Sequence, residues 1–122
     1  MTLQELYRMI GGDYDQALRV LRVEKLVDKH IRKFPQNGTV EELLAAGEDM
    51  DPKRLFESAH ALKGISANLG LVRLSETASR ITEEYRPGSG RKMTDDEVRA
   101  LLDSVREQNE IIVEGIRLYS EG

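Results

Sequence analysis

Cysteine and tryptophan are absent from this chain of 122 residues, and proline occurs only three times. The lack of cysteine excludes a disulfide framework, a thiol nucleophile and a thiolate zinc site, and it fits the reducing cytoplasm, where we expect the protein. The few prolines and the 33% of charged residues favour a folded helical protein. The length accommodates one core, so we expect a single domain over residues 1–122.

Long apolar runs and a strong net charge are also missing. No run approaches the ~20 residues of a membrane-spanning helix, and the first ten residues, MTLQELYRMI, are periodic rather than signal-like. The formal net charge is -4, which provides no strong field to attract nucleic acid or anionic lipid. We therefore expect neither nucleic acid nor membrane among the partners.

Helix-start signals are abundant. Five motifs place a capping residue directly before a periodic apolar segment: Thr2 with Glu5, Asp13 with Gln16, Thr39 with Glu42, Asp51 with Pro52, and Thr94 with Glu97. Glycine and proline breaks separate these segments. Since no stretch alternates with a period of two residues, the sequence predicts an all-α fold.

Apolar residues at helical spacing define four long helices, over about residues 14–34, 52–69, 71–86 and 94–119. Short additional helices are predicted near residues 3–10 and 40–48. The apolar stripes of the first two long helices are Val20, Val23, Val27, Ile31 and Phe34, and Leu55, Ala59, Leu62, Ser66 and Leu69. Four such helices with short connections pack most simply as an antiparallel four-helix bundle. The heptad-like last helix is explained by its core face, so we expect a monomer.

The second long helix carries His60, one of two histidines, and a glycine, Gly64, one turn later. Glycine costs about 1 kcal/mol relative to alanine inside a helix. From the centre of the apolar stripe, His60 lies roughly 140° away, Gly64 roughly 180° and Ala67 roughly 120°. Phe56 and Lys63 lie on the flanks, at roughly 100° and roughly 80°. We therefore expect the imidazole at the surface, above a small flat patch of Phe56, Gly64 and Ala67 that would bind a partner.

This arrangement suits transfer of a phosphoryl group. An imidazole in water is largely unprotonated near neutral pH and is a nucleophile without an activating base. Gly64 and Ala67 would let the pocket of another protein approach, and Lys63 would offer a positive charge to the phosphoryl oxygens. The residues alone leave open a non-catalytic helical adaptor that docks a partner through the same surface. A zinc site is disfavoured because zinc takes three or four protein ligands, and His30 near a helix end is interpreted as structural.

Residues 59–74, AHALKGISANLGLVRL, resemble the signature of the histidine phosphotransfer (HPt) domain family. That signature is Ala-His-x-Leu-Lys-Gly, then a Leu-Gly pair at the end of the helix, then a Leu in the next helix. The positions that agree are Ala59, His60, Leu62, Lys63, Gly64, Leu69, Gly70 and Leu74. The stretches at 11–18 and 51–60 are also similar to the family, so the resemblance covers about residues 11–86.

The resemblance implies a four-helix bundle that carries a phosphoryl group on His60. It would accept the group from, and donate it to, aspartates of response-regulator receiver domains, including one in a hybrid sensor kinase. In the family, the lysine that matches Lys63 supports the phosphoryl group, and the glycine that matches Gly64 leaves room for the receiver. Since the chain has no nucleotide-binding loop, we expect a carrier without kinase activity and without a cofactor or metal of its own.

One position departs from the family pattern. Many members have a Gln or Glu on the following helix that hydrogen-bonds the imidazole and orients it. A hairpin that turns near Gly70 would bring residues 80–84 opposite His60, where Thr82 stands with Glu83 and Glu84 beside it. Thr82 and Glu84 are therefore the candidate orienting residues, and the choice between them stays open.

Overall fold

The computed structural model describes all 122 residues and confirms the all-α prediction, since every regular element is helical. In chain order the helices are α1 (Leu3–Ile10), α2 (Tyr14–Leu21), α3 (Glu24–Lys33), a short 3-10 helix (Phe34–Gln36), α4 (Thr39–Asp49), α5 (Pro52–Asn68), α6 (Val72–Tyr85) and α7 (Asp95–Glu121). Of the five predicted starts, those capped by Thr2, Asp13, Asp51 and Thr94 are confirmed. α4 differs, because Gly38 is its N-cap and the Thr39 side chain bonds to Asn37 instead.

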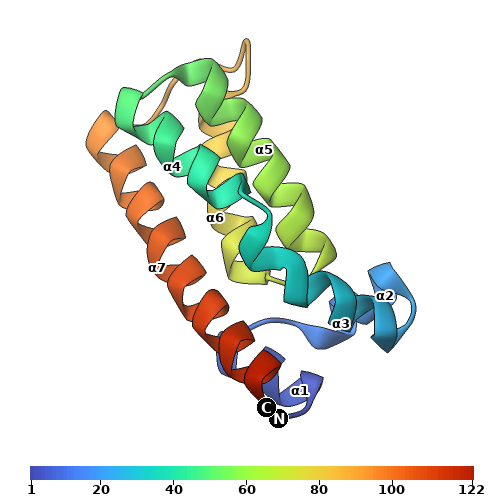
Figure 1. Ribbon diagram of the computed structural model, residues 1–122. Coiled ribbons are helices and arrows are strands. Elements are labelled where there is room, and N and C mark those ends of the chain that lie inside the picture. The colour runs from blue at the N-terminus through green and yellow to red at the C-terminus, as the bar shows by residue number, and fades with distance from the viewer.

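Helices α4 to α7 form the body of the molecule, and Figure 1 shows that they run alternately up and down. α5 packs on α4 and α6, and α7 packs on α6 and α4, so the four helices close into a ring with α5 and α7 diagonally opposed. α1, α2 and α3 lie around the lower end of this ring in Figure 1. The two chain termini meet at the same end, where Gly122 lies next to Met1.

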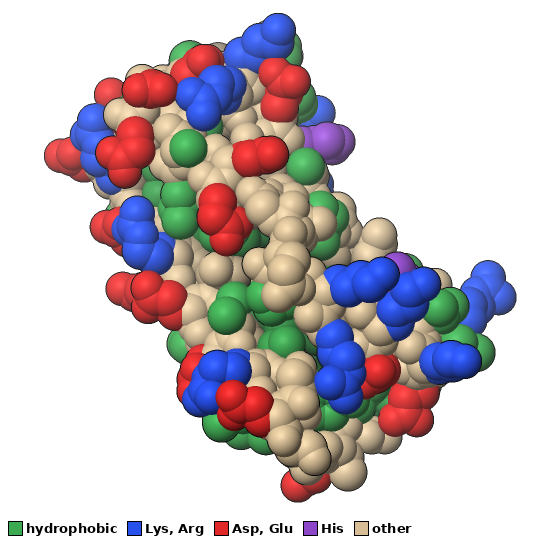
Figure 2. Space-filling model, in the orientation of Figure 1, with side chains coloured by type: hydrophobic (Ala, Val, Ile, Leu, Met, Phe, Trp, Pro, Cys, Tyr) green, Lys and Arg blue, Asp and Glu red, His purple; other side chains and the backbone are tan.

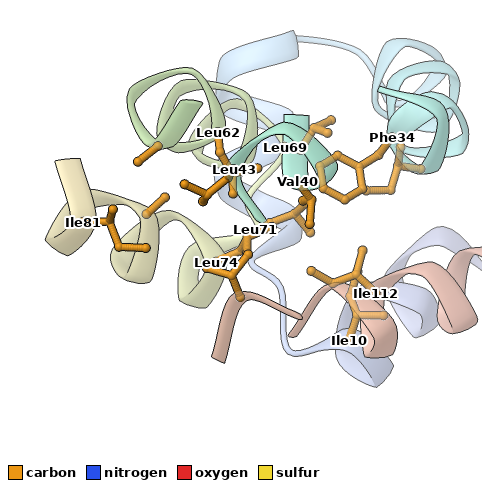
Figure 3. Packing of buried hydrophobic residues seen from close by; sticks show 14 of the residues in the cluster. Ile10, Phe34, Val40, Leu43, Leu62, Leu69, Leu71, Leu74, Ile81 and Ile112 are labelled. Atoms are coloured by element: carbon orange, nitrogen blue, oxygen red, sulfur yellow. The ribbon is translucent and has the colours of Figure 1, made fainter. Parts of the chain in front are cut away.

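The core between these helices is one cluster of 26 buried apolar residues. Figure 3 shows Leu43, Leu62, Ile81 and Ile112 reaching into it from α4, α5, α6 and α7. Each residue of the apolar stripe predicted over 52–69 is buried. Its one polar member, Ser66, is accommodated because its hydroxyl donates to the Leu62 carbonyl oxygen one turn earlier, at 2.5 Å.

The predicted continuous helix over 14–34 is wrong, because the segment forms two helices that meet at Arg22 and Val23. Arg22 adopts a φ of 78° and ends α2, and Val23 is extended and begins α3 without a side-chain cap. As a result Val20 and Val23 are exposed rather than buried. The apolar spacing continues across the break and no glycine or proline marks it. α4, predicted as a short additional helix, takes the place of this segment in the ring.

Hydrogen bonds fasten the N-terminal helices to the turn between α5 and α6. The Tyr7 hydroxyl donates to the Leu69 carbonyl oxygen at 2.6 Å, and Gln16 Nε2 donates to the Ala67 carbonyl oxygen at 2.9 Å. The Asp13 amide donates to the Gly70 carbonyl oxygen at 2.8 Å. Gly70 has a φ of +68°, and a Cβ there would collide with the Asp13 backbone, so only glycine fits. α2 is thereby held against the last turn of α5.

A buried carboxylate organises the loop between α6 and α7. Glu84 accepts a hydrogen bond from Arg91 Nε at 2.6 Å and from the backbone amides of Lys92 and Met93 at 3.2 and 3.0 Å. Burial by itself raises the pKa of Glu84, but these hydrogen bonds outweigh it and hold the pKa below its ordinary value of 4.5. The ionised carboxylate therefore stabilises the folded chain.

We predict that Glu84→Gln lowers the free energy of unfolding at pH 7 by about 1–3 kcal/mol, because a neutral amide accepts fewer of these hydrogen bonds and adds an unpaired donor. The folded pKa lies below the unfolded one, so the stabilisation is complete above the ordinary pKa of glutamate and is lost as the pH falls through the folded pKa. Urea unfolding from pH 7 to pH 3 should thus show a smaller pH-dependent loss in the variant than in the wild type.

The matched control is Glu107→Gln, since Glu107 is exposed on α7 and its side chain makes no hydrogen bond or ion pair. It should leave the stability almost unchanged. An equal effect of the two substitutions at pH 7 would contradict the assigned role of Glu84.

Candidate functional site

The outward face of α5 presents His60 to solvent, as the spacing of the stripe predicts. Leu55, Ala59 and Leu62 are completely buried, so the rotation of the helix is determined by the core and the imidazole lies on the opposite side. α5 itself is well defined locally, because Asp51 caps its start through the amides of Lys53 and Arg54 and Pro52 occupies its first turn.

Gly64 leaves the surface beside His60 open. It is exposed, and a Cβ at this position would meet no atom within 4 Å. The glycine therefore serves no close packing inside the chain, in contrast to Gly115 on α7, where a Cβ would lie 2.5 Å from Ile10 Cγ2. The space above Gly64 is available to another molecule.

The Phe56 ring lies against the imidazole one turn before it on α5. The two ring centroids are 5.7 Å apart with an angle of 14° between the planes, which is a stacked arrangement. The guanidinium of Arg86, at the end of α6, lies 5.5 Å from the centroid of the same Phe56 ring. Phe56 is half-buried, so the stacking partner of His60 is itself held in place.

Glu83 on α6 completes the polar surroundings of His60, and the sequence analysis did not single it out. Arg86 Nη2 donates to its carboxylate at 2.7 Å. This hydrogen bond lowers the pKa of Glu83, and the charges of Arg86, Lys63 and His60 lower it further. The carboxylate is exposed, and it lies within the electrostatic reach of both His60 and Lys63 without a hydrogen bond to the imidazole.

Neither candidate orienting residue hydrogen-bonds the imidazole of His60. Thr82 is fully buried and its hydroxyl donates to the Ala78 carbonyl oxygen at 2.8 Å. Glu84 is turned toward the α6–α7 loop, as described above. The predictions for Thr82 and Glu84 are therefore corrected: the rotation of α6 exposes Glu83 and buries the residues on either side of it. No side chain hydrogen-bonds His60, and the Phe56 ring is stacked against it.

Lys63 and Ala67 flank the exposed face. Lys63 is half-buried on the α6 side, where its carbonyl oxygen accepts a hydrogen bond from Ser75 Oγ at 3.3 Å. Ala67 is half-buried on the α2 side, next to Gln16. The structure thus brings the predicted residues Phe56, Lys63, Gly64 and Ala67 to the same side of α5 as His60.

Other kinds of site find little support in the chain. No group of three or more His, Cys, Asp or Glu side chains is placed to hold a metal ion. His30, predicted as structural, is exposed in the last turn of α3. None of the helices combines the length and the apolar character that crossing a membrane requires.

The fold and the site define a helical bundle that presents an accessible histidine on one of its long helices. A family model described as the Hpt domain matches residues 35–108, which is more than half of the chain. Searches of curated proteins and of solved structures gave no match.

The chain therefore belongs to the Hpt domain family. Hpt domains are phosphocarrier modules that take part in histidine phosphotransfer in phosphorelays, where they interact with receiver domains and kinases. The match covers α4, α5, α6 and the first half of α7, and thus includes His60. It does not include α1, α2 and α3.

Proposed function

We propose that His60 is the phosphoacceptor of a monomeric cytoplasmic carrier that exchanges phosphoryl groups with aspartates of response-regulator receiver domains. The observation that carries this proposal is the exposed imidazole beside the open surface at Gly64. A phosphoryl group held in the pocket of a receiver is accessible only to a nucleophile that enters that pocket, and a bulky residue at position 64 would keep the two proteins apart.

The reaction proposed is an in-line transfer between two side chains. An unprotonated nitrogen of His60 attacks the phosphorus of an aspartyl phosphate, an N–P bond forms, and the P–O bond to the aspartate breaks. The electron pair returns to the aspartate carboxylate, and the reverse step loads another receiver. Lys63 would contribute positive charge near the phosphoryl oxygens. A metal ion that assists such a step would be held by the receiver.

The stacked Phe56 ring supports a second part of the proposal, which concerns how the imidazole is held. With Thr82 buried, the hydrogen bond that the resemblance implies is missing. A ring stacked at 5.7 Å and 14° restricts the orientation of the imidazole, and Arg86 beside Phe56 restricts Phe56 in turn. Phe56 would therefore act as a positioning residue.

We predict that His60→Gln abolishes transfer of label from phosphorylated receiver domains, because an amide is not a nucleophile for this step. The free energy of unfolding should be unchanged, because residue 60 is exposed. Labelling should be followed after incubation with a panel of receivers phosphorylated by an acyl phosphate. The product of the wild type should be labile in acid and stable in base, as a phosphoramidate is. A variant that is still labelled would refute the assignment, and a wild type that binds receivers without becoming labelled would indicate an adaptor.

Gly64→Ala should separate the carrier role from a packing role. Because nothing surrounds a Cβ at position 64, the substitution should raise the stability by up to about 1 kcal/mol through helix propensity. It should nevertheless slow phosphoryl transfer by about tenfold or more, since the methyl group obstructs a partner. Gly115→Ala is the control, and it should lower the stability by about 1–3 kcal/mol because Ile10 occupies the space. Unchanged transfer by Gly64→Ala would contradict the proposed contact.

Phe56→Leu should lower the maximal rate of transfer at saturating receiver by about tenfold, because a misaligned nucleophile reacts more slowly. Phe56→Tyr keeps the stacked ring and should restore the rate. The measurement is the transfer rate as a function of receiver concentration, with urea unfolding to show that both variants are folded. An increase of KM alone, without a change of the maximal rate, would contradict a positioning role.

A further inference from the structure

The junction of α2 and α3 exposes apolar side chains that the rest of the molecule leaves uncovered. Val20, Val23 and Leu26 have exposed fractions of 46%, 50% and 38%, which places them among the few large apolar residues at the surface. They lie within seven residues of one another along the chain. Such a group marks a contact surface more often than scattered single residues do.

Four cationic residues alternate with these side chains along the chain and make no ion pair. Arg19, Arg22, Lys25 and Lys29 are exposed and make no ion pair. Most arginines after residue 50 are paired with a carboxylate, namely Arg54, Arg86, Arg91, Arg99, Arg106 and Arg117, and Arg73 and Arg80 are the exceptions. The Asp28 carboxylate is occupied by Arg32 and Tyr119. Glu24 is the other carboxylate within residues 19–29 and is exposed, so the four cations exceed it by three charges. We call the three apolar and these four cationic residues the α2–α3 corner.

The backbone of the corner is not optimised for stability. Arg22 has a φ of 78°, a region that non-glycine residues seldom adopt, and Val23 begins α3 without a side-chain cap. A glycine at position 22 and a serine or aspartate at position 23 would suit this junction better. The residues present instead add charge and apolar surface where a partner can reach them.

The corner is continuous with the face of α5 that presents His60. Gln16 binds α2 to Ala67, and a groove between α3 and α5 is lined by His30, Lys33, Ile65 and Asn68. Asn68 follows Gly64 by one turn on the same face of α5, so the groove begins next to the open surface. Figure 2 shows Lys and Arg side chains gathered over this lower right end of the molecule, with apolar side chains at its edge.

A receiver domain seated on His60 would extend as far as the corner. Asn68 lies about 12 Å from His60 along the helix axis, at 1.5 Å per residue. A domain of about 120 residues is roughly 30 Å across, and a stable interface covers about 800 Å² of each partner. The face of α5 is a single helix and is too narrow to provide that area alone. α6 extends it on the side of Glu83 and Arg86, and α2 and α3 extend it at the C-terminal end of α5.

We propose that the α2–α3 corner is a docking surface for an acidic, partly apolar face of the receiver domain that exchanges phosphoryl groups with His60. The inference rests on the proposed function of His60. The corner lies outside residues 35–108, the part matched by the family model. Unpaired cations in a chain whose formal net charge is -4 attract an acidic surface and steer its approach. The corner thus contributes to which receiver is chosen, whereas His60 carries out the transfer.

The test is the double variant Arg22→Glu with Lys25→Glu in the full chain. The transfer rate is measured against the concentration of a phosphorylated receiver at 50 mM and 300 mM salt. We expect the KM of the variant to rise about tenfold at 50 mM salt, with the maximal rate unchanged within a factor of two. The wild-type KM should increase with salt, and that of the variant should increase less. Val20→Ser with Val23→Ser should raise KM at both salt concentrations, because it removes apolar contact only.

The matched control is Arg99→Glu with Arg106→Glu, which changes the net charge equally on α7, diagonally opposite α5. It should leave KM unchanged, and urea unfolding should show all three double variants folded. If the wild type transfers normally and the corner variants have the same KM as the wild type, this inference is overturned and the proposed function stands. If the corner variants have an unchanged KM but lose binding to phosphatidylserine vesicles, the inference is overturned and the corner binds a lipid surface. If no receiver labels the wild type, both proposals fail.

Discussion

The rotation of α5 about its own axis is the constraint on which the functional surface depends. Leu55, Ala59 and Leu62 are fully buried, and a turn of the helix by one residue would move His60 by about 100° toward the neighbouring helices. Burial of apolar area contributes about 25 cal/mol per Å², so the core holds α5 in the one rotation in which the imidazole faces solvent. No further side chain is needed to expose it.

Two glycines on either side of this surface illustrate opposite uses of a missing side chain. Gly64 leaves the surface beside His60 open, whereas Gly70 allows the backbone of the N-terminal segment to approach the α5–α6 turn closely. Through Gly70, α2 is held close to the end of α5, within one turn of Gly64 along that helix. Charge pairing differs as well: Arg86, Arg106 and Arg117 are engaged with neighbouring carboxylates, whereas the four cations of the α2–α3 corner make no ion pair.

The spacing of residues was sufficient to predict the surface position of His60, because α5 is one uninterrupted helix with a single apolar stripe. The same reasoning failed at Arg22 and Val23, where the stripe continues in the sequence although the helix does not. No glycine, proline or capping side chain marks that break, so a local pattern carries no record of it. The surroundings of the imidazole were also beyond prediction. They depend on how α6 is rotated against α5, and a difference of one position exposes Glu83 in place of Thr82.

The meeting of the two chain termini affects how the protein can be engineered. Met1 and Gly122 are neighbours at the end of the bundle where α7 finishes, so a short linker could join them into a closed chain. New ends could then be opened in the exposed stretch at residues 87–90, producing a circular permutant with the same helices. For the same reason a fluorophore or an affinity tag at either original end would emerge from one place, beside α1, and both labelling positions would report on the same local environment.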